Sequence, residues 1–142
     1  MGVVRQGAVA GAAAAAAWAA LEPLAARALG TDYSDARLLG RLIRPHGTGW
    51  RAAGLAAHVA NGAVAGALFA RAGLRGPLAG VAAASIEGLA VWPGMAMVDR
   101  VHPDVRSGRW PRLLTDRRVF AQEAVMHGLF GALLGLGVRR SP

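Results

Sequence analysis

Four long apolar segments, nearly free of charged side chains, alternate with shorter polar stretches along the chain. An apolar segment of about twenty residues is long enough to cross a bilayer as a helix. The pattern therefore predicts four membrane spans, at about residues 6–29, 52–70, 77–98 and 120–138. We expect them to form an all-α, polytopic membrane four-helix bundle, with residues 1–142 as one membrane domain.

The four segments differ in hydrophobicity and in their ends. The first is rich in Ala, which is only marginally hydrophobic, and Glu22 and Pro23 interrupt its far end. The second carries no formal charge and is the clearest span. Because only residues 71–76 join the second and third segments, we expect these two to be antiparallel neighbours. Trp92-Pro93-Gly94 predicts a kinked or unwound exit from the third segment.

Two long connections, residues 30–51 and 99–119, lie at one end of the predicted bundle, which we call the loop face. Ser34 followed by Asp35 is typical of a helix start. Residues 34–44 then form an amphipathic pattern, with arginines on its polar side. We expect this segment to lie on the membrane surface.

Composition supports a membrane protein. The chain is 54% hydrophobic and 17% charged, fewer charges than an ordinary soluble surface carries. It has no cysteine, which excludes disulfides, thiolate metal sites and iron–sulfur clusters. All sixteen basic residues are Arg, they lie in the gaps between apolar segments, and the net charge is +8. This distribution favours contact with anionic lipid headgroups over nucleic acid. The expected partner is the lipid bilayer, with a homo-oligomer or another membrane protein left open.

The arginines also predict an orientation. The excess of positive charge on one side of a membrane protein usually marks the cytoplasmic side. Five arginines fall on the face opposite the loops: Arg5, Arg71, Arg75, Arg139 and Arg140. The other eleven fall on the loop face, which we therefore expect to be cytoplasmic in a bacterial inner membrane: Arg27, Arg37, Arg41, Arg44, Arg51, Arg100, Arg106, Arg109, Arg112, Arg117 and Arg118.

The two halves of the chain come into register when the sequence is shifted on itself by 69 residues. The informative matches are His58 with His127 and the Asp-x-Arg pairs that begin at Asp35 and Asp104. The shift predicts two tandem helical hairpins as a parallel repeat, with the two histidines at matching depth. The other matches are Gly7 with Gly76, Gly11 with Gly80, Gly62 with Gly131, Gly66 with Gly135, Arg37 with Arg106 and Arg71 with Arg140.

Polar side chains inside the spans are the candidate functional residues, because they are costly in a bilayer and mark sites or buried partners. At about 1.5 Å of rise per residue, every acidic or imidazole side chain in the spans falls in the half of the bilayer nearest the loop face. We therefore expect a polar cavity open toward the loop face. Its predicted members are His58, Asn61, Glu87, Glu123 and His127, with Glu22, Asp35 and Asp104 as additional candidates. Small-residue stripes predict helix packing at Gly7, Gly11, Gly62, Gly66, Gly131 and Gly135.

Several interpretations of these residues stay open. They could be hydrogen-bonded packing groups that orient the helices, or they could relay protons, since imidazole exchanges protons near neutral pH. A divalent metal could be held by His58, Glu87, Glu123 and His127, whose chemistry suits such ligands. A b-type haem between the two histidines is a less favoured alternative. No nucleophilic triad, phosphate loop or dinucleotide motif is present.

The order of motifs from residue 58 to residue 135 resembles a known group. It runs H-x2-N-G-x3-G, then P-x2-G with a Trp-Pro exit, then E-x3-H-G-x2-G. This is similar to the YagU-like proteins, small bacterial inner-membrane proteins without an assigned activity. The resemblance implies a four-span inner-membrane protein with a His/Glu feature.

The leading hypothesis is a non-enzymatic, transporter-like or accessory membrane protein. The alternatives are a metal- or haem-dependent membrane enzyme or redox module, and a purely structural subunit.

Overall fold

The computed structural model describes residues 2–138, and 81% of these residues are helical, with no strand among them. Four helical stretches are long and apolar enough to cross a membrane. They are α1 (Val3–Leu29), α3 (Trp50–Arg71), α4 with its continuation to Val101 (Pro77–Val101), and α7 (Arg117–Gly137). The predicted all-helical fold with four long apolar helices is confirmed.

Local sequence explains where these helices stop and bend. Helix α1 continues through Pro23 and ends at Gly30, whose φ of 67° is a left-handed conformation that glycine adopts without strain. Helix α4 (Pro77–Val91) passes into the 3-10 turn η1 (Trp92–Gly94) and then α5 (Met95–Val101). The predicted break at Trp92-Pro93-Gly94 is therefore present. It contains Pro93, which has no backbone N–H to donate.

Side chains of the connections cap the N-termini of some of the other helices. Helix α2 (Asp35–Ile43) starts where predicted, because the Ser34 hydroxyl accepts the backbone N–H of Arg37 at 3.3 Å. Short helix α6 (Pro103–Arg106) and 3-10 turn η2 (Leu113–Thr115) follow in the second connection. Helix α7 begins after Asp116, whose carboxylate accepts the N–H groups of Arg118 and Val119.

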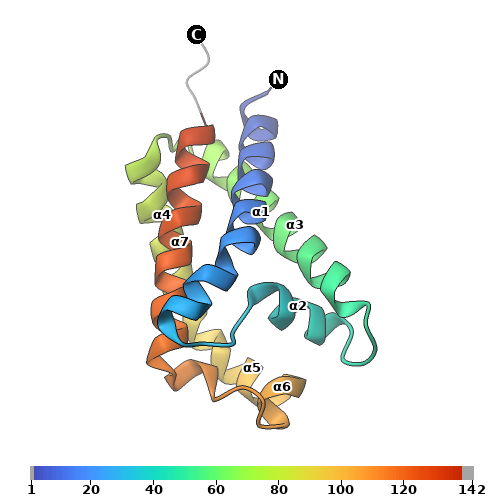
Figure 1. Cartoon of the computed structure of the whole chain (residues 1–142). Coiled ribbons are helices and arrows are strands. Elements are labelled where there is room, and N and C mark those ends of the chain that lie inside the picture. The colour runs from blue at the N-terminus through green and yellow to red at the C-terminus, as the bar shows by residue number, and fades with distance from the viewer. Residues whose placement is uncertain (1, 139–142) are drawn as a thin grey trace.

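The long helices are packed in the spatial order α3, α1, α7, α4 (Figure 1). Helix α1 packs against both α3 and α7, and α4 packs against α7. Helices α3 and α4 diverge from the short connection that joins them (Figure 1). The expectation that these two would be packed neighbours is therefore wrong, because each packs against the other long helix of its own half of the chain.

Glycines form close crossings between the long helices. A Cβ added at Gly7 or Gly11 of α1 would collide with the carbonyl oxygen of Gly66 or Gly62 of α3. At the crossing of α4 and α7, Gly80 faces Gly131 in the same way, and Gly135 faces Gly76. Hydrogen in place of a side chain lets the backbones approach this closely. All six glycines singled out from the sequence lie at these crossings.

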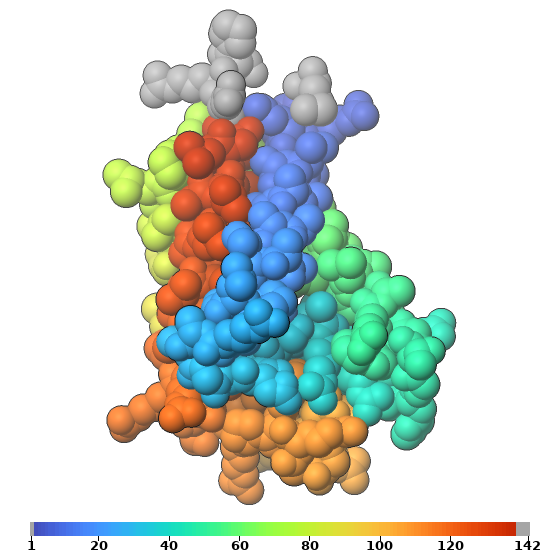
Figure 2. All heavy atoms as spheres, viewed as in Figure 1, coloured from blue at the N-terminus to red at the C-terminus, as the bar shows by residue number. Residues whose placement is uncertain are grey.

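The two connections at the loop face, residues 30–49 and 95–116, pack together as a second unit, which we call the cap. The cap contains α2, α5, α6 and η2. Figure 2 shows the segment around α2 lying against the segment around α6, below the long helices. The cap has its own apolar core, which consists of Tyr33, Leu38, Trp110, Leu113 and Val119. Helix α2 packs on α3, and its Arg37 and Arg41 turn toward α6. Its expected position on the membrane surface stays a prediction.

Candidate functional site

Trp18 of α1 organises the polar residues of the long helices. Its indole is 4% exposed, and its centroid lies 5.3 Å from that of His58 on α3 and 4.8 Å from that of His127 on α7. Both imidazoles meet the indole edge-on, at interplanar angles of 70° and 75°. The structure therefore brings the two predicted histidines to the same level, packed on one shared side chain.

Each imidazole faces a carboxylate from a different helix. His127 Nε2 lies 3.2 Å from Glu87 Oε2 of α4, and His58 Nδ1 lies 4.0 Å from Asp35 Oδ2 of α2. The other nitrogen of His127, Nδ1, lies 2.8 Å from the backbone carbonyl oxygen of Glu123. A carbonyl oxygen only accepts, so Nδ1 carries a hydrogen. A hydrogen bond between Nε2 and Glu87 then requires one further proton, which the imidazole and the carboxylate share.

Two further carboxylates lie beside this pair. Glu22, 3% exposed, accepts from Trp18 Nε1 at 3.3 Å and from the backbone N–H of Asp35 at 2.8 Å. Glu123, 6% exposed, places Oε2 4.0 Å from His127 Nδ1, and its Oε1 has no hydrogen-bond partner among the described residues. Glu22 thereby connects the indole of α1 to the start of α2.

The cap covers the loop-face end of this cluster. Tyr33 is 2% exposed and donates its hydroxyl to Asp35 at 2.7 Å. Gln122 of α7, fully buried, donates to the Tyr33 carbonyl oxygen at 3.2 Å and also bonds to the Thr31 hydroxyl. Glu87 is not covered in this way, because 52% of its side chain is exposed on the flank of α4. Glu87 is therefore the most exposed of these side chains, and the expected opening toward the loop face stays a prediction.

Burial sets the protonation behaviour of the cap residues at this junction. It raises the pKa of Asp35, against the hydrogen bond from Tyr33 and the charge of His58, which lower it. Burial, with the charge of Asp35 next, raises the pKa of the Tyr33 hydroxyl well above its usual value. Tyr33 therefore keeps its proton and remains a hydrogen-bond donor to Asp35.

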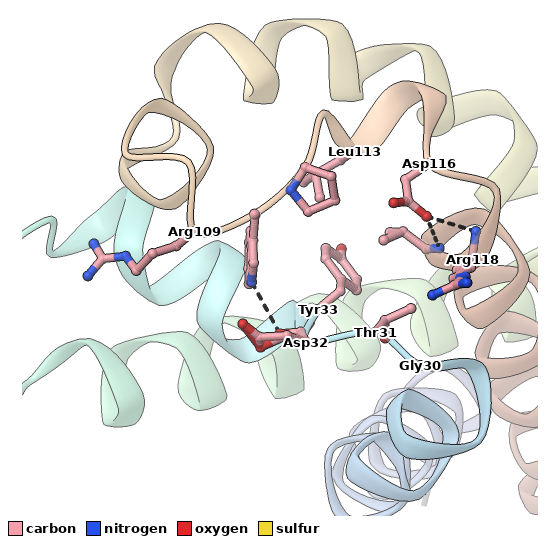
Figure 3. A pocket seen from close by; sticks show the side chains of 11 residues that line it. Gly30, Thr31, Asp32, Tyr33, Arg109, Leu113, Asp116 and Arg118 are labelled. Carbon is pink, nitrogen blue, oxygen red and sulfur yellow. Dashed lines mark hydrogen bonds between the residues drawn. The ribbon is translucent and has the colours of Figure 1, made fainter.

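A cavity of about 220 Å³ lies on the cap side of Tyr33. Figure 3 shows Tyr33 among the lining side chains, with Arg109 on one side and Asp116 and Arg118 on the other. Trp110 forms another wall and donates its Nε1–H to the Asp32 carbonyl oxygen at 3.1 Å. Tyr33 thus has this cavity on one side and Asp35 on the other.

Two predicted members lie elsewhere. Asn61 is on the exposed side of α3, and Asp104 is in the cap, where three arginines surround it. The structure joins His58, Glu87, Glu123 and His127 with the additional candidates Glu22 and Asp35, through the contacts described above.

This arrangement does not assemble the metal centre considered from the sequence. Within residues 2–138, no three His, Asp or Glu side chains are placed to hold one metal ion. Helix α1 runs between α3 and α7 (Figure 1). The Trp18 indole contacts both histidines. The same indole stands where a haem ligated by both histidines would need its ring.

Trp18, Tyr33 and Gln122 are site residues that the sequence analysis missed. A signal for Trp18 was available, because the shift of 69 residues that matches His58 with His127 also matches Trp18 with Glu87. Both side chains of that match contact the histidine of their own half. No comparable signal marked Tyr33 and Gln122, which are brought together by the folding of the cap.

Comparison of the chain with protein-family models, with curated proteins and with solved structures finds no match.

Proposed function

We propose that this protein is a multi-pass membrane protein of the transporter-like or accessory kind, whose Glu87–His127 pair exchanges protons at an intramembrane site. The four long apolar helices support the membrane location. So do the large apolar side chains on their outer surfaces, such as Leu78, which is 87% exposed, and Ile86, which is 67% exposed. Surfaces of this kind suit lipid better than water.

The proposal includes the bacterial inner membrane, the four-helix membrane bundle and the tandem hairpin repeat. The two glycine crossings support the repeat, since Gly7–Gly66 and Gly11–Gly62 correspond residue for residue to Gly76–Gly135 and Gly80–Gly131 under the shift of 69 residues. The YagU-like relationship of residues 58–135 belongs to this proposal on its motifs alone.

The observation that carries the proposal is the close approach of the Glu87 carboxylate to the His127 imidazole. Their atoms are 3.2 Å apart, His127 is 13% exposed, and Glu87 is 52% exposed. A carboxylate beside an imidazole can take a proton from its surroundings and pass it inward. Further polar contacts lead from that pair toward the cap, through Trp18, Glu22, Asp35 and His58.

The proposal is tested by proton flux into vesicles that contain the purified protein and a trapped pH-sensitive dye. We expect faster acidification than in protein-free vesicles after an outside acid step. Glu87→Gln removes the exchangeable proton and should reduce the added flux at least about tenfold, within the range of general acid–base effects. Asn61→Ala, on the exposed side of α3, is the matched control and should leave the flux unchanged.

A purely structural role is the second candidate, favoured by the hydrogen bonds of Glu22 with Trp18 and Asp35. Measurements of stability separate it from proton exchange. Because Gln has the size of Glu and can still form a hydrogen bond with His127 Nε2, Glu87→Gln should change the free energy of unfolding by no more than about 1 kcal/mol. Wild-type vesicles that acidify no faster than empty ones would contradict proton exchange. A large loss of stability in Glu87→Gln would support the structural role.

A further inference from the structure

A basic hollow of about 370 Å³ lies on the cap, apart from the intramembrane residues. Its lining consists of Arg37, Arg41, Trp50, Arg51, Asp104 and Arg109, and we call it the arginine pocket. The residues come from α2, the start of α3, α6 and the chain after α6. Folding therefore brings Arg109 of the second connection to three arginines of the first half of the chain.

The Asp104 carboxylate positions three of these arginines. Its side chain is fully buried and lies 2.8 Å from Arg37 Nε, 2.9 Å from an Arg109 nitrogen and 3.7 Å from an Arg41 nitrogen. A guanidinium has five N–H donors, so each of these arginines keeps donors that Asp104 does not use. The buried carboxylate thus positions the arginines without itself facing solvent.

The pocket keeps a surplus of positive charge. Besides Asp104, only the exposed Asp32 pairs with one of its arginines among the described residues, at 3.4 Å from Arg37. Four guanidinium groups therefore meet two carboxylates. Arg51 makes no ion pair within residues 2–138 and lies over the Trp50 ring, 5.3 Å from its centroid. That cation–π contact fixes the direction of an otherwise free guanidinium.

We propose that the arginine pocket binds a phosphate group, carried either by an anionic phospholipid or by a soluble phosphate ester. Several converging guanidinium groups give the charge and the paired donors that phosphate oxygens accept. Trp50 and Arg51 are the first residues of α3, one of the four candidate spans. If α3 spans the bilayer, the pocket lies at the depth of the lipid headgroups, where Trp and Arg are common.

The test measures binding to the purified full chain in a zwitterionic detergent by calorimetry. Its probes are inorganic phosphate, glycerol 3-phosphate and short-chain phosphatidylglycerol. Arg51→Gln and Arg41→Gln should each weaken binding at least about tenfold, the effect of one lost charge-assisted hydrogen bond. Arg106→Gln, exposed in neighbouring α6 and outside the pocket, should weaken it less than about twofold.

The outcomes separate the two sources and can overturn the site. Binding of phosphatidylglycerol alone assigns the pocket to lipid, and comparable binding of all three probes assigns it to soluble phosphate compounds. Absence of binding by every probe overturns the proposal, as does an equal loss in Arg106→Gln. Arg51 has no ion pair to lose, so its variant should keep the wild-type circular dichroism. Arg41→Gln provides an independent measurement if it does not.

Discussion

At the scale of single residues, Asp104 shows how the cap is held together. Burial alone would raise the pKa of its carboxyl group, but the hydrogen bond from Arg37 and the charges of Arg37, Arg109 and Arg41 lower it. The carboxylate is therefore ionised at neutral pH and bridges α2 to the segment around α6. Its neighbour His102 is also fully buried and stacks on Trp110, with ring centroids 4.8 Å apart.

Replacing this carboxylate should weaken the cap. Asp104→Asn leaves three arginines without their shared anion, and we expect a loss of about 2–3 kcal/mol in the free energy of unfolding at pH 7. Because the pKa of Asp104 is lowered in the folded chain, its contribution is complete above the unfolded value of about 3.9 and disappears as the pH falls below it. The difference between wild type and variant should therefore shrink as the pH is lowered below that value, toward the lower pKa of the folded chain, in melts followed by tryptophan fluorescence. A constant difference from pH 7 to pH 3 would contradict this account.

At the level of residues, the sequence alone marks a position where the chemistry of the side chain is unusual for its surroundings. His58, Glu87, Glu123 and His127 are conspicuous because polar groups are rare in apolar helices. The sequence could not show that Asn61 faces outward, since a helix with little amphipathic contrast does not indicate which side is covered. It also could not show that Arg37 and Arg41 turn to Asp104, because an amphipathic pattern does not distinguish water from another polar segment.

At the scale of helices, the glycine crossings determine which helices pair. Helix α1 meets α3, and α4 meets α7, with the carbonyl oxygen of one helix against the Cα of the other. The stripes were visible in the sequence, but the pairing was not. The length of residues 71–76 suggested that α3 and α4 would pack together, yet a short connection only keeps helix ends close.

Helix α7 allows this close approach to be measured within a single helix. Gly131→Ala places a methyl group against the Gly80 carbonyl oxygen and should lower stability by about 1–3 kcal/mol. Gly128→Ala, three residues earlier, meets nothing within 4 Å and should raise stability by up to about 1 kcal/mol. Gly62→Ala, in the other crossing, should cost about as much as Gly131→Ala. Unfolding in mixed detergent micelles gives the three values, and similar effects of Gly131→Ala and Gly128→Ala would contradict the crossing.

At the scale of the whole molecule, the two exposed ends of the helix layer differ in charge. The cap end carries most of the arginines, while the start of α1 and the end of α7 lie together at the other end (Figure 1). Arg139 and Arg140, which the orientation argument also uses, lie outside the described residues, as does the match of Arg71 with Arg140.

The absence of cysteine makes orientation directly measurable. We expect a membrane-impermeant maleimide to label Leu74→Cys in intact bacterial cells, because residue 74 is exposed at the end opposite the cap. His46→Cys, exposed at the cap end, should be labelled only after lysis if the cap is cytoplasmic. The reverse pattern would place the cap outside the cell.

The pairing of helices within each half has a consequence for how the chain is made. The crossing of α1 and α3 can form once α3 has been synthesised, before any residue of α4 exists. Helix α1, rich in alanine and a weak candidate for entering lipid unaided, therefore has its binding partner available early during translation. The second half repeats the sequence of events with α4 and α7, after which α1 and α7 come together. On this basis, we expect the α1–α3 pair to form before the α4–α7 pair, and the two pairs to associate afterwards.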